Sequence, residues 1–206
     1  MSARDAILAA VRRAAVPPVA LPDVPDAWPA VRAGTASGAD VARLFSEMLG
    51  QVGGTAVELN GMGALAAAVA DLPAARVARE SGRGIVSSVP GLPISTLVIG
   101  PDAARARLDQ VELAIIPGRI GVAENAAIWV SEEDVPHRAL PFVAQHLAIV
   151  LPKGEIVADL HAAYRRLRPP LPGYGVFISG PSKTADIEQA LVIGAQGPKS
   201  LTVYLV

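Results

Sequence analysis

The chain has 206 residues, a hydrophobic fraction of 51% and a formal net charge of −1. This length suits one α/β domain with a short N-terminal extension, and the apolar content is ample for a core. The near-neutral charge gives no electrostatic reason to expect a nucleic-acid partner. No apolar run approaches the roughly 20 residues that cross a bilayer, so we expect no membrane insertion.

The sequence contains no cysteine. Disulfides, thiolate nucleophiles and cysteine-ligated iron–sulfur clusters are therefore excluded within this chain. Residues 1–13 are alanine-rich and lack the basic start, continuous apolar centre and cleavage site of a secretory signal. We therefore expect a cytoplasmic location.

The N-terminal region reads as a helix followed by a tether. Residues 2–15 predict a short amphipathic helix, with Ile7, Leu8 and Val11 on one side. The next stretch is rich in proline, which removes backbone donors and fixes φ, so it predicts an extended connector. The helix packs either on its own domain or on a partner. We divide the chain into residues 1–29, the helix and connector, and residues 30–206, an α/β domain.

Helical and strand patterns alternate along the α/β domain. We expect helices from a cap at Ser37 or Asp40 through Met48, and over 61–72, 103–108 and 156–167. We expect strands over 55–59, 76–78, 85–89, 97–99, 111–116, 127–130 and 147–151. The last of these is an uninterrupted apolar run, typical of a central strand covered on both faces. The alternation predicts a three-layer α/β sandwich with a largely parallel sheet.

The C-terminal region carries the most informative pattern. A strand over 176–179 precedes a glycine turn, a helix is expected over 185–193, and a strand over 201–206 ends the chain. This order predicts a βαβ unit. The turn after its first strand would lie at the carboxyl edge of the sheet, where open α/β folds place their ligands.

The turn itself has the composition of an anion site. Gly180, Ser182, Lys183 and Thr184 offer backbone amides, two hydroxyls and one cation near an expected helix N-terminus, which favours phosphate or carboxylate. The spacing is not that of a Walker A loop. The alternative is structural, with Ser182 or Thr184 capping the helix.

The amino-acid sequence of this region resembles that of a known family. Residues 180–188 with 197–206 resemble the closing signature of the LUD-domain proteins, and 122–130, 137–142 and 145–147 fit the same family. The resemblance spans roughly Ile115 to Val206. It implies a component of a lactate-utilisation system that oxidises L-lactate to pyruvate with iron–sulfur partner proteins. Since the chain has no cysteine, those partners would hold the clusters, and we expect no cofactor bound by this chain.

The family also implies a candidate nucleophile. LUD domains are similar in fold to the NagB/RpiA/CoA-transferase superfamily, in which CoA transferases use the glutamate of a Ser-Glu-Asn-Gly motif for covalent catalysis. Here Glu124 and Asn125 match, while Ala123 and Ala126 replace the flanking Ser and Gly. Three roles stay open for Glu124: nucleophile, ligand-binding or general-base residue, and structural hydrogen-bonding residue.

Histidine supplies the remaining candidate. His146 precedes the apolar strand, where it acts either as an acid or base near neutral pH or as a satisfied hydrogen-bonding residue. His137 and His161 lack the tight spacing of a metal site, so we expect no bound metal. Two functions remain: an accessory subunit of an iron–sulfur oxidoreductase system, or a free-standing enzyme of the CoA-transferase or formyl-tetrahydrofolate cyclo-ligase kind that acts on a small anionic substrate.

Overall fold

The computed structural model describes residues 2–14, 38–167, 173–184 and 192–206. The chain divides into two units, Met1–Arg32 and Ala33–Val206. In the first unit, α1 (Ala3–Arg13) begins with a capping box, in which the Ser2 hydroxyl accepts from the Asp5 N–H and the Asp5 carboxylate accepts from the Ser2 N–H. This reciprocal pair satisfies two of the donors that a helix start leaves without partners.

The second unit is built on a parallel sheet. Among the described residues this central sheet has five strands in the order β1-β11-β6-β3-β2, and all four pairings are parallel. The strands are β1 (Thr55–Glu58), β2 (Gly84–Ser87), β3 (Val111–Pro117), β6 (His146–Leu151) and β11 (Ser200–Leu205). The predicted apolar strand is therefore confirmed as β6, and it occupies the middle of the sheet.

Each face of the central sheet buries its own apolar cluster. Along β6, Leu147, Ile149 and Leu151 face one cluster, whereas Ala148 and Val150 face the other. Successive side chains of a strand point to opposite faces, so an unbroken apolar run is what a strand covered on both sides requires. This explains why β6 carries no internal polar residue.

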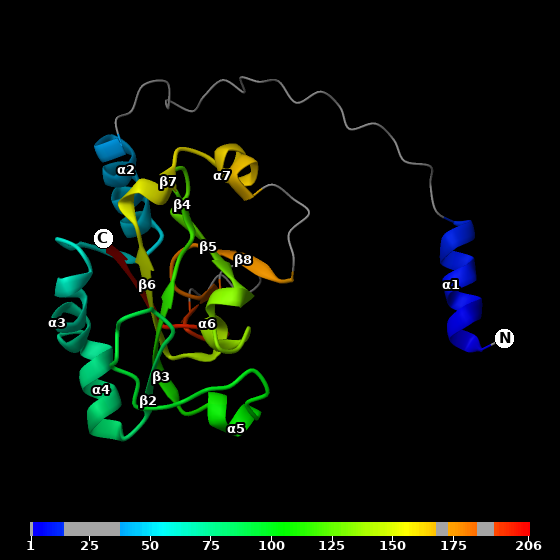
Figure 1. Cartoon of the computed structure of the whole chain (residues 1–206), viewed down its shortest axis with the longest axis horizontal. Coiled ribbons are helices and arrows are strands. Elements are labelled where there is room, and N and C mark those ends of the chain that lie inside the picture. Colours follow the sequence, from blue (N-terminus) through cyan, green and yellow to red (C-terminus); the bar gives the residue numbers. More distant parts are fainter. Residues whose placement is uncertain (1, 15–37, 168–172, 185–191) are drawn as a thin grey trace. The chain divides into compact units, whose positions relative to one another are not determined.

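Helices cover one of these faces and a second sheet covers the other (Figure 1). The helical layer contains α3 (Leu65–Ala70), preceded by η1 (Met62–Ala64), and α4 (Pro73–Ser81). On the opposite side lie α2 (Gly38–Gln51) and a four-stranded sheet in the order β7-β4-β5-β8. Its strands are β4 (Ile120–Val122), β5 (Ala127–Ser131), β7 (Ile156–Val157) and β8 (Gly175–Ile178).

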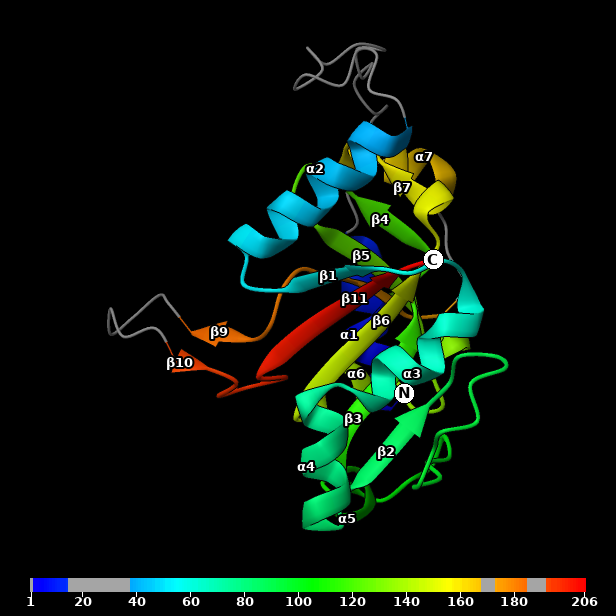
Figure 2. The same ribbon diagram turned by 90° about the vertical axis from the view of Figure 1, so that its left-hand side faces the viewer.

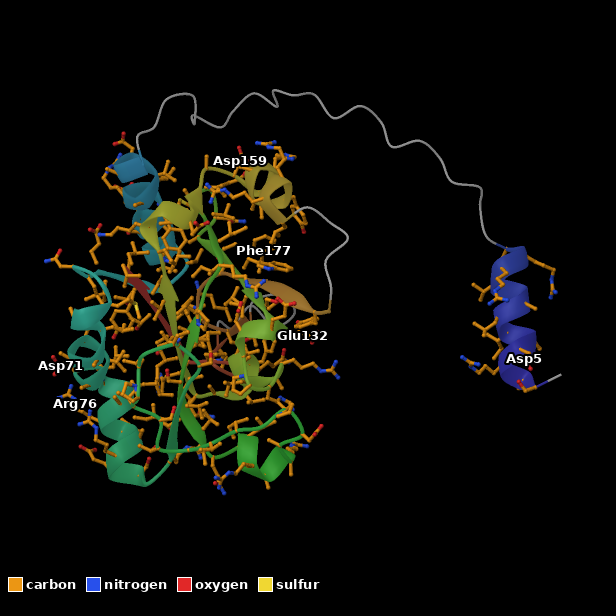
Figure 3. The ribbon with its side chains drawn as sticks, viewed as in Figure 1. Asp5, Asp71, Arg76, Glu132, Asp159 and Phe177 are labelled. Atoms are coloured by element: carbon orange, nitrogen blue, oxygen red, sulfur yellow. The ribbon has the colours of Figure 1, made fainter. Side chains whose placement is uncertain are left out.

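The second sheet approaches the central sheet closely at glycines. A Cβ added to Gly121 would lie 2.6 Å from Leu151 Cδ2, and one added to Gly118 would lie 2.6 Å from Ile128 Cγ2. These distances are shorter than van der Waals contact, so a side chain at either position would have to displace a buried neighbour, Leu151 or Ile128. On the outer face of the second sheet, Phe177 of β8 packs edge-on against Trp129 at 4.9 Å between ring centroids and lies below α7 (Leu160–Leu167) (Figure 3).

Shorter elements complete the second unit. They are α5 (Arg105–Leu108), η2 (Glu132–Asp134), α6 (Leu140–Val143), η3 (Lys153–Glu155), α7 (Leu160–Leu167), β9 (Lys183–Thr184) and β10 (Val192–Ile193). Arg119 binds Glu133 and Asp134 of η2, and these two carboxylates raise the pKa of the Arg119 guanidinium. The carboxylates of Glu133 and Asp134 are thus paired within the chain.

The three-layer α/β sandwich with a largely parallel sheet is confirmed, while several element predictions are wrong. Residues 76–78 lie in helix α4 rather than a strand, and 97–99 form no strand. The helix expected over 156–167 begins only at Leu160, because Ile156 and Val157 pair with β4 as β7. The capping residue Ser37 lies outside the described residues, and α2 begins at Gly38.

The predicted βαβ unit is also wrong. β8 belongs to the second sheet and β11 to the central sheet, so the two strands are not neighbours. Of the helix expected over 185–193, residues 185–191 lie outside the described residues, and Val192 and Ile193 form β10, antiparallel to β9. The glycine turn therefore lies between two strands that belong to different sheets.

Candidate functional site

The turn after β8 is anchored at both of its ends. Gly180 has φ +72°, and a Cβ there would lie 2.6 Å from the backbone oxygen of Val52. The Ser182 N–H donates to the Pro198 backbone oxygen at 2.9 Å, and the Ser182 backbone oxygen accepts from the Gly194 N–H. The Ser182 amide is therefore occupied, so at this residue the hydroxyl, not the N–H, is the group that the turn offers to an anion.

The Lys183 side chain, which carries the positive charge of the turn, lies over the α2–β1 connection. Lys183 is exposed, and its Cε and Nζ lie 3.4 Å from the point where a Cβ on Gly53 would stand. Thr184 instead serves the β9–β10 pair, since its hydroxyl interacts with the Val192 backbone oxygen at 3.3 Å and N–H at 3.2 Å. Of the predicted anion-binding residues, Ser182 and Lys183 remain the best placed to present side chains.

The Glu124–Asn125 turn is held by the second sheet. The Glu124 side chain is exposed, and its carboxylate accepts from the Leu160 N–H at 3.2 Å. Glu124 thus caps the start of α7, a role that needs only an acceptor oxygen. Asn125 closes its own turn, because its side-chain oxygen accepts from the Ala127 N–H at 3.0 Å.

His146 lies at the first position of β6. Its Nδ1 is 2.7 Å from the Ser200 hydroxyl, and its Nε2 is 3.7 Å from the nearer Glu112 carboxylate oxygen. Ser200 is the register partner of His146 on β11. Partial burial lowers the pKa of His146; the charge of Glu112 raises it and that of Lys199 lowers it further. At neutral pH the ring is therefore uncharged and able to accept a proton.

Glu112 owes its position to a β-bulge. The β2–β3 register pairs Gly84 with Val111 but Ile85 with Leu113, so Glu112 is an extra residue on β3. Such bulges re-aim a side chain within a sheet. The carboxylate is buried, with 8% of the side chain exposed, and it accepts from Arg83 Nε at 2.6 Å. Arg83 also donates to the Asp109 backbone oxygen.

These positions correct the expected location of the site. β6 begins at His146 and β11 at Ser200, so both residues lie at the amino edge of the central sheet, not its carboxyl edge. The β9–β10 pair extends from this same edge (Figure 2). Ser182 reaches it through its bond to Pro198, two residues before Ser200. Ser182 is thus tied to the segment that leads into β11 at the edge where His146 lies, whereas the Glu124 carboxylate contacts the start of α7.

Sequence reasoning missed Glu112, Ser200 and Arg83. One signal was available for Glu112, because it is the single charged residue in the otherwise apolar run 111–116. Ser200 and Arg83 give no such signal, since each belongs to an ordinary polar stretch. Among the described residues, no group of three or more His, Cys, Asp or Glu side chains is arranged to hold a metal ion. Nor does the described part of the chain contain a helix long and apolar enough to cross a membrane.

Fold and site define an α/β sandwich protein with a polar amino edge, and sequence comparison assigns its family. The LUD domain model matches residues 100–206, just over half of the chain. The chain belongs to the LUD domain family.

Relatives and a solved structure agree with this assignment. Lactate utilization protein C of Shouchella clausii is 31% identical over 103 residues, which are 46% of this chain and 45% of that protein. Its namesake in Geobacillus kaustophilus is 28% identical over 115 residues, 52% and 48% of the two chains. The chain thus spans about half the length of these curated relatives. The crystal structure of a DUF162 family protein from Deinococcus radiodurans shares the fold, with a TM-score of 0.59, 19% identity and coverage of 84% of this chain and 99% of that one.

Proposed function

We propose that this chain is an accessory component of an L-lactate utilisation system that oxidises lactate to pyruvate together with iron–sulfur partner proteins in the cytoplasm. The observation that carries the proposal is the match of the LUD segment to proteins named lactate utilization protein C. The absence of cysteine supports the division of labour, because cysteine-ligated clusters would have to reside on a partner.

The amino edge supports a role in holding a small anion. Lys183 and Lys199 are exposed, and each is the sequence neighbour of a serine, Ser182 and Ser200; ammonium and hydroxyl groups are the donor chemistry that a carboxylate requires. Lys199 is also close enough to His146 to lower the pKa of the imidazole. A carboxylate such as that of lactate would be bound by these side chains, while the redox step takes place on the partner.

The alternative of a free-standing CoA-transferase-like or cyclo-ligase-like enzyme depends on Glu124 as a nucleophile. Its carboxylate accepts from the Leu160 N–H and caps α7. That contact gives Glu124 a structural task and does not favour the alternative.

Complementation tests the proposed role. A host that lacks its own lactate utilization protein C should regain growth on L-lactate when it expresses this chain, with growth on pyruvate as the control for general fitness. The purified chain alone should not reduce a redox dye with lactate, whereas the chain with its iron–sulfur partners should. Lactate-dependent dye reduction by the isolated chain would contradict the accessory role.

The anion site is tested separately with a matched pair of lysines. Lys183→Gln should weaken lactate binding measured by calorimetry. Lys153→Gln removes an equal charge near the carboxyl ends of the strands, where Lys153 lies 3.5 Å from Glu58, and should leave binding unchanged. If both variants weakened lactate binding equally, the effect would come from the overall charge of the chain and not from a site at Lys183.

A further inference from the structure

A row of polar side chains crosses the amino edge of the central sheet. Ser200 on β11, His146 on β6 and Glu112 on β3 stand on three adjacent strands, and Arg83 precedes β2, the next strand. Each member contacts the next, at 2.7, 3.7 and 2.6 Å. Among the described residues, Glu112 and Ser131 are the buried polar or charged ones, so the row places a buried carboxylate beside a partly exposed histidine.

The order of groups along the row is that of an activated hydroxyl. A nucleophile needs a base within hydrogen-bonding reach, and the base needs a third group that orients it. The Glu112 carboxylate lies 3.7 Å from His146 Nε2, and its negative charge favours the neutral tautomer with the proton on Nε2. Nδ1 is then the acceptor for the Ser200 hydroxyl. At 3.7 Å the carboxylate acts through its charge, since this distance exceeds that of a hydrogen bond.

We propose that Ser200 is a nucleophile for acyl transfer from a small ester or thioester, with His146 as its base and Glu112 as the positioning residue. This activity goes beyond the lactate role and does not depend on it. The distances, the order of groups and the burial gradient along the row all support it.

The row is buried at Glu112 and becomes more accessible to solvent toward the Ser200 hydroxyl. The Glu112 side chain is 8% exposed and that of His146 is 23% exposed, while Ser200 is half-buried. On β11, Leu201 and Val203 face the second sheet, so Ser200 and Thr202 face the other side. Thr55, the register partner of Thr202, is exposed there. The carboxylate is therefore shielded and the hydroxyl is reachable.

The proposed step balances within the named groups. Ser200 Oγ forms a bond to the acyl carbon as the bond from that carbon to the leaving oxygen or sulfur breaks. The hydroxyl proton passes to His146 Nδ1 and then to the leaving group. Water, deprotonated in turn by His146, hydrolyses the acyl-serine and restores the hydroxyl. The positive charge of Lys199, which acts on His146, would also favour the negative charge that develops on the acyl oxygen.

Labelling of the full-length chain provides the first test. A fluorophosphonate probe should modify Ser200, as mapped by mass spectrometry, and p-nitrophenyl acetate should release a burst of nitrophenol. Ser200→Ala should abolish both signals, and His146→Gln should slow labelling about 100-fold, the usual contribution of a positioned base. Ser81→Ala is the control, because the Ser81 hydroxyl donates to the Val77 backbone oxygen and accepts from the Arg83 backbone N–H, and neither of these groups is a base. Labelling that persists in Ser200→Ala, or no labelling of the wild type, would overturn the proposal.

Cysteine substitution gives a second test that needs no substrate. The chain has no cysteine, so Ser200→Cys and Ser81→Cys each carry a single thiol. Beside a base, the thiol at position 200 should react with iodoacetamide at pH 7 at least 10-fold faster than the thiol at position 81, and His146→Gln should remove the difference. Equal rates in the two variants would refute activation by His146.

The role of Glu112 is read from a pH profile. Its negative charge raises the pKa of His146, so Glu112→Gln should move the acid limb of the labelling rate to lower pH. A folded Glu112→Gln variant with an unshifted profile would exclude Glu112 as the positioning residue. If that variant fails to fold, the cysteine pair decides the proposal by itself.

Discussion

The hydroxyl of Ser179 donates a 2.7 Å hydrogen bond to the backbone oxygen of Asn125. This bond joins the segment 122–130, which the family resemblance marks, to the residue that directly precedes the marked segment 180–188, and the two residues lie 54 positions apart in the sequence. One residue further on, Gly180 packs against Val52 and directs the chain toward the amino edge. The family-marked turn is therefore a fixed link from the second sheet to the edge where His146 lies.

The rigidity of this link predicts the effect of Gly180→Ala. The residue has φ +72°, which costs a non-glycine residue about 1 kcal/mol, and the new Cβ would lie 2.6 Å from the Val52 backbone oxygen. We expect a loss of about 2 kcal/mol or more in the free energy of unfolding, measured with urea. Gly63→Ala is the control, since nothing lies within 4 Å of its added Cβ. Equal stabilities of the two variants would show that the link tolerates a shift.

The capping role of Glu124 predicts a different pair of effects. Glu124→Ala removes the acceptor for the Leu160 N–H and should lower the free energy of unfolding by about 1 kcal/mol. Glu124→Gln keeps an acceptor oxygen, so it should stay within about 0.5 kcal/mol of the wild type and support growth on lactate. Loss of lactate growth by Glu124→Gln at a normal protein level would contradict this expectation and favour Glu124 as a catalytic residue.

The strands of the central sheet were predictable where one signal dominated. The run 147–151 is apolar at every position, so only a doubly covered strand accommodates it. Residues 76–78 misled because they mix apolar and charged types, and only their position after Pro73 at the helix start marks α4. Ile156 and Val157 form β7 through pairing with β4, a long-range contact that local pattern does not contain.

Of the polar row at the amino edge, the sequence predicted His146 but neither its partners nor their geometry. His146 was identified from its chemistry, yet its partner Ser200 depends on strand register, which is set by the packing of the whole sheet. The position of Glu112 depends on a bulge, a local irregularity without a sequence signature here. The prediction that the site lies at the carboxyl edge was wrong. It assumed that both strands within residues 176–206 belong to one sheet, whereas β8 and β11 belong to two different sheets.

Tyr204 provides a prediction about the helical layer. The side chain is buried, its hydroxyl donates to the Ala68 backbone oxygen at 3.0 Å, and burial with the nearby charge of Asp71 raises its pKa to about 12 (Figure 3 labels Asp71). Tyr204→Phe should cost about 1 kcal/mol of stability. In a spectrophotometric titration, one of the three tyrosines should ionise late, and Tyr204→Phe should remove that phase. A late phase that survives the substitution would assign it to another tyrosine.

The raised pKa of Tyr204 also predicts how the stability of the wild type changes at high pH. The folded pKa of Tyr204 lies above the ordinary value of 10, so its contribution to stability is complete below pH 10 and is lost as the pH rises toward 12. The unfolding free energy of Tyr204→Phe should therefore fall less over this range than that of the wild type.

His146 predicts the opposite dependence at low pH. Burial and the charge of Lys199 lower its pKa below the ordinary value of 6.5, and the charge of Glu112 opposes them. The unfolded chain therefore binds more protons at this site than the folded chain. The contribution of neutral His146 is complete above pH 6.5 and is lost as the pH falls through the folded pKa. We expect the free energy of unfolding to decrease over that range and His146→Gln to flatten the decrease. A wild-type slope that survives in His146→Gln would place its origin in other groups, and an NMR titration of the imidazole C–H signals would then show an unshifted His146.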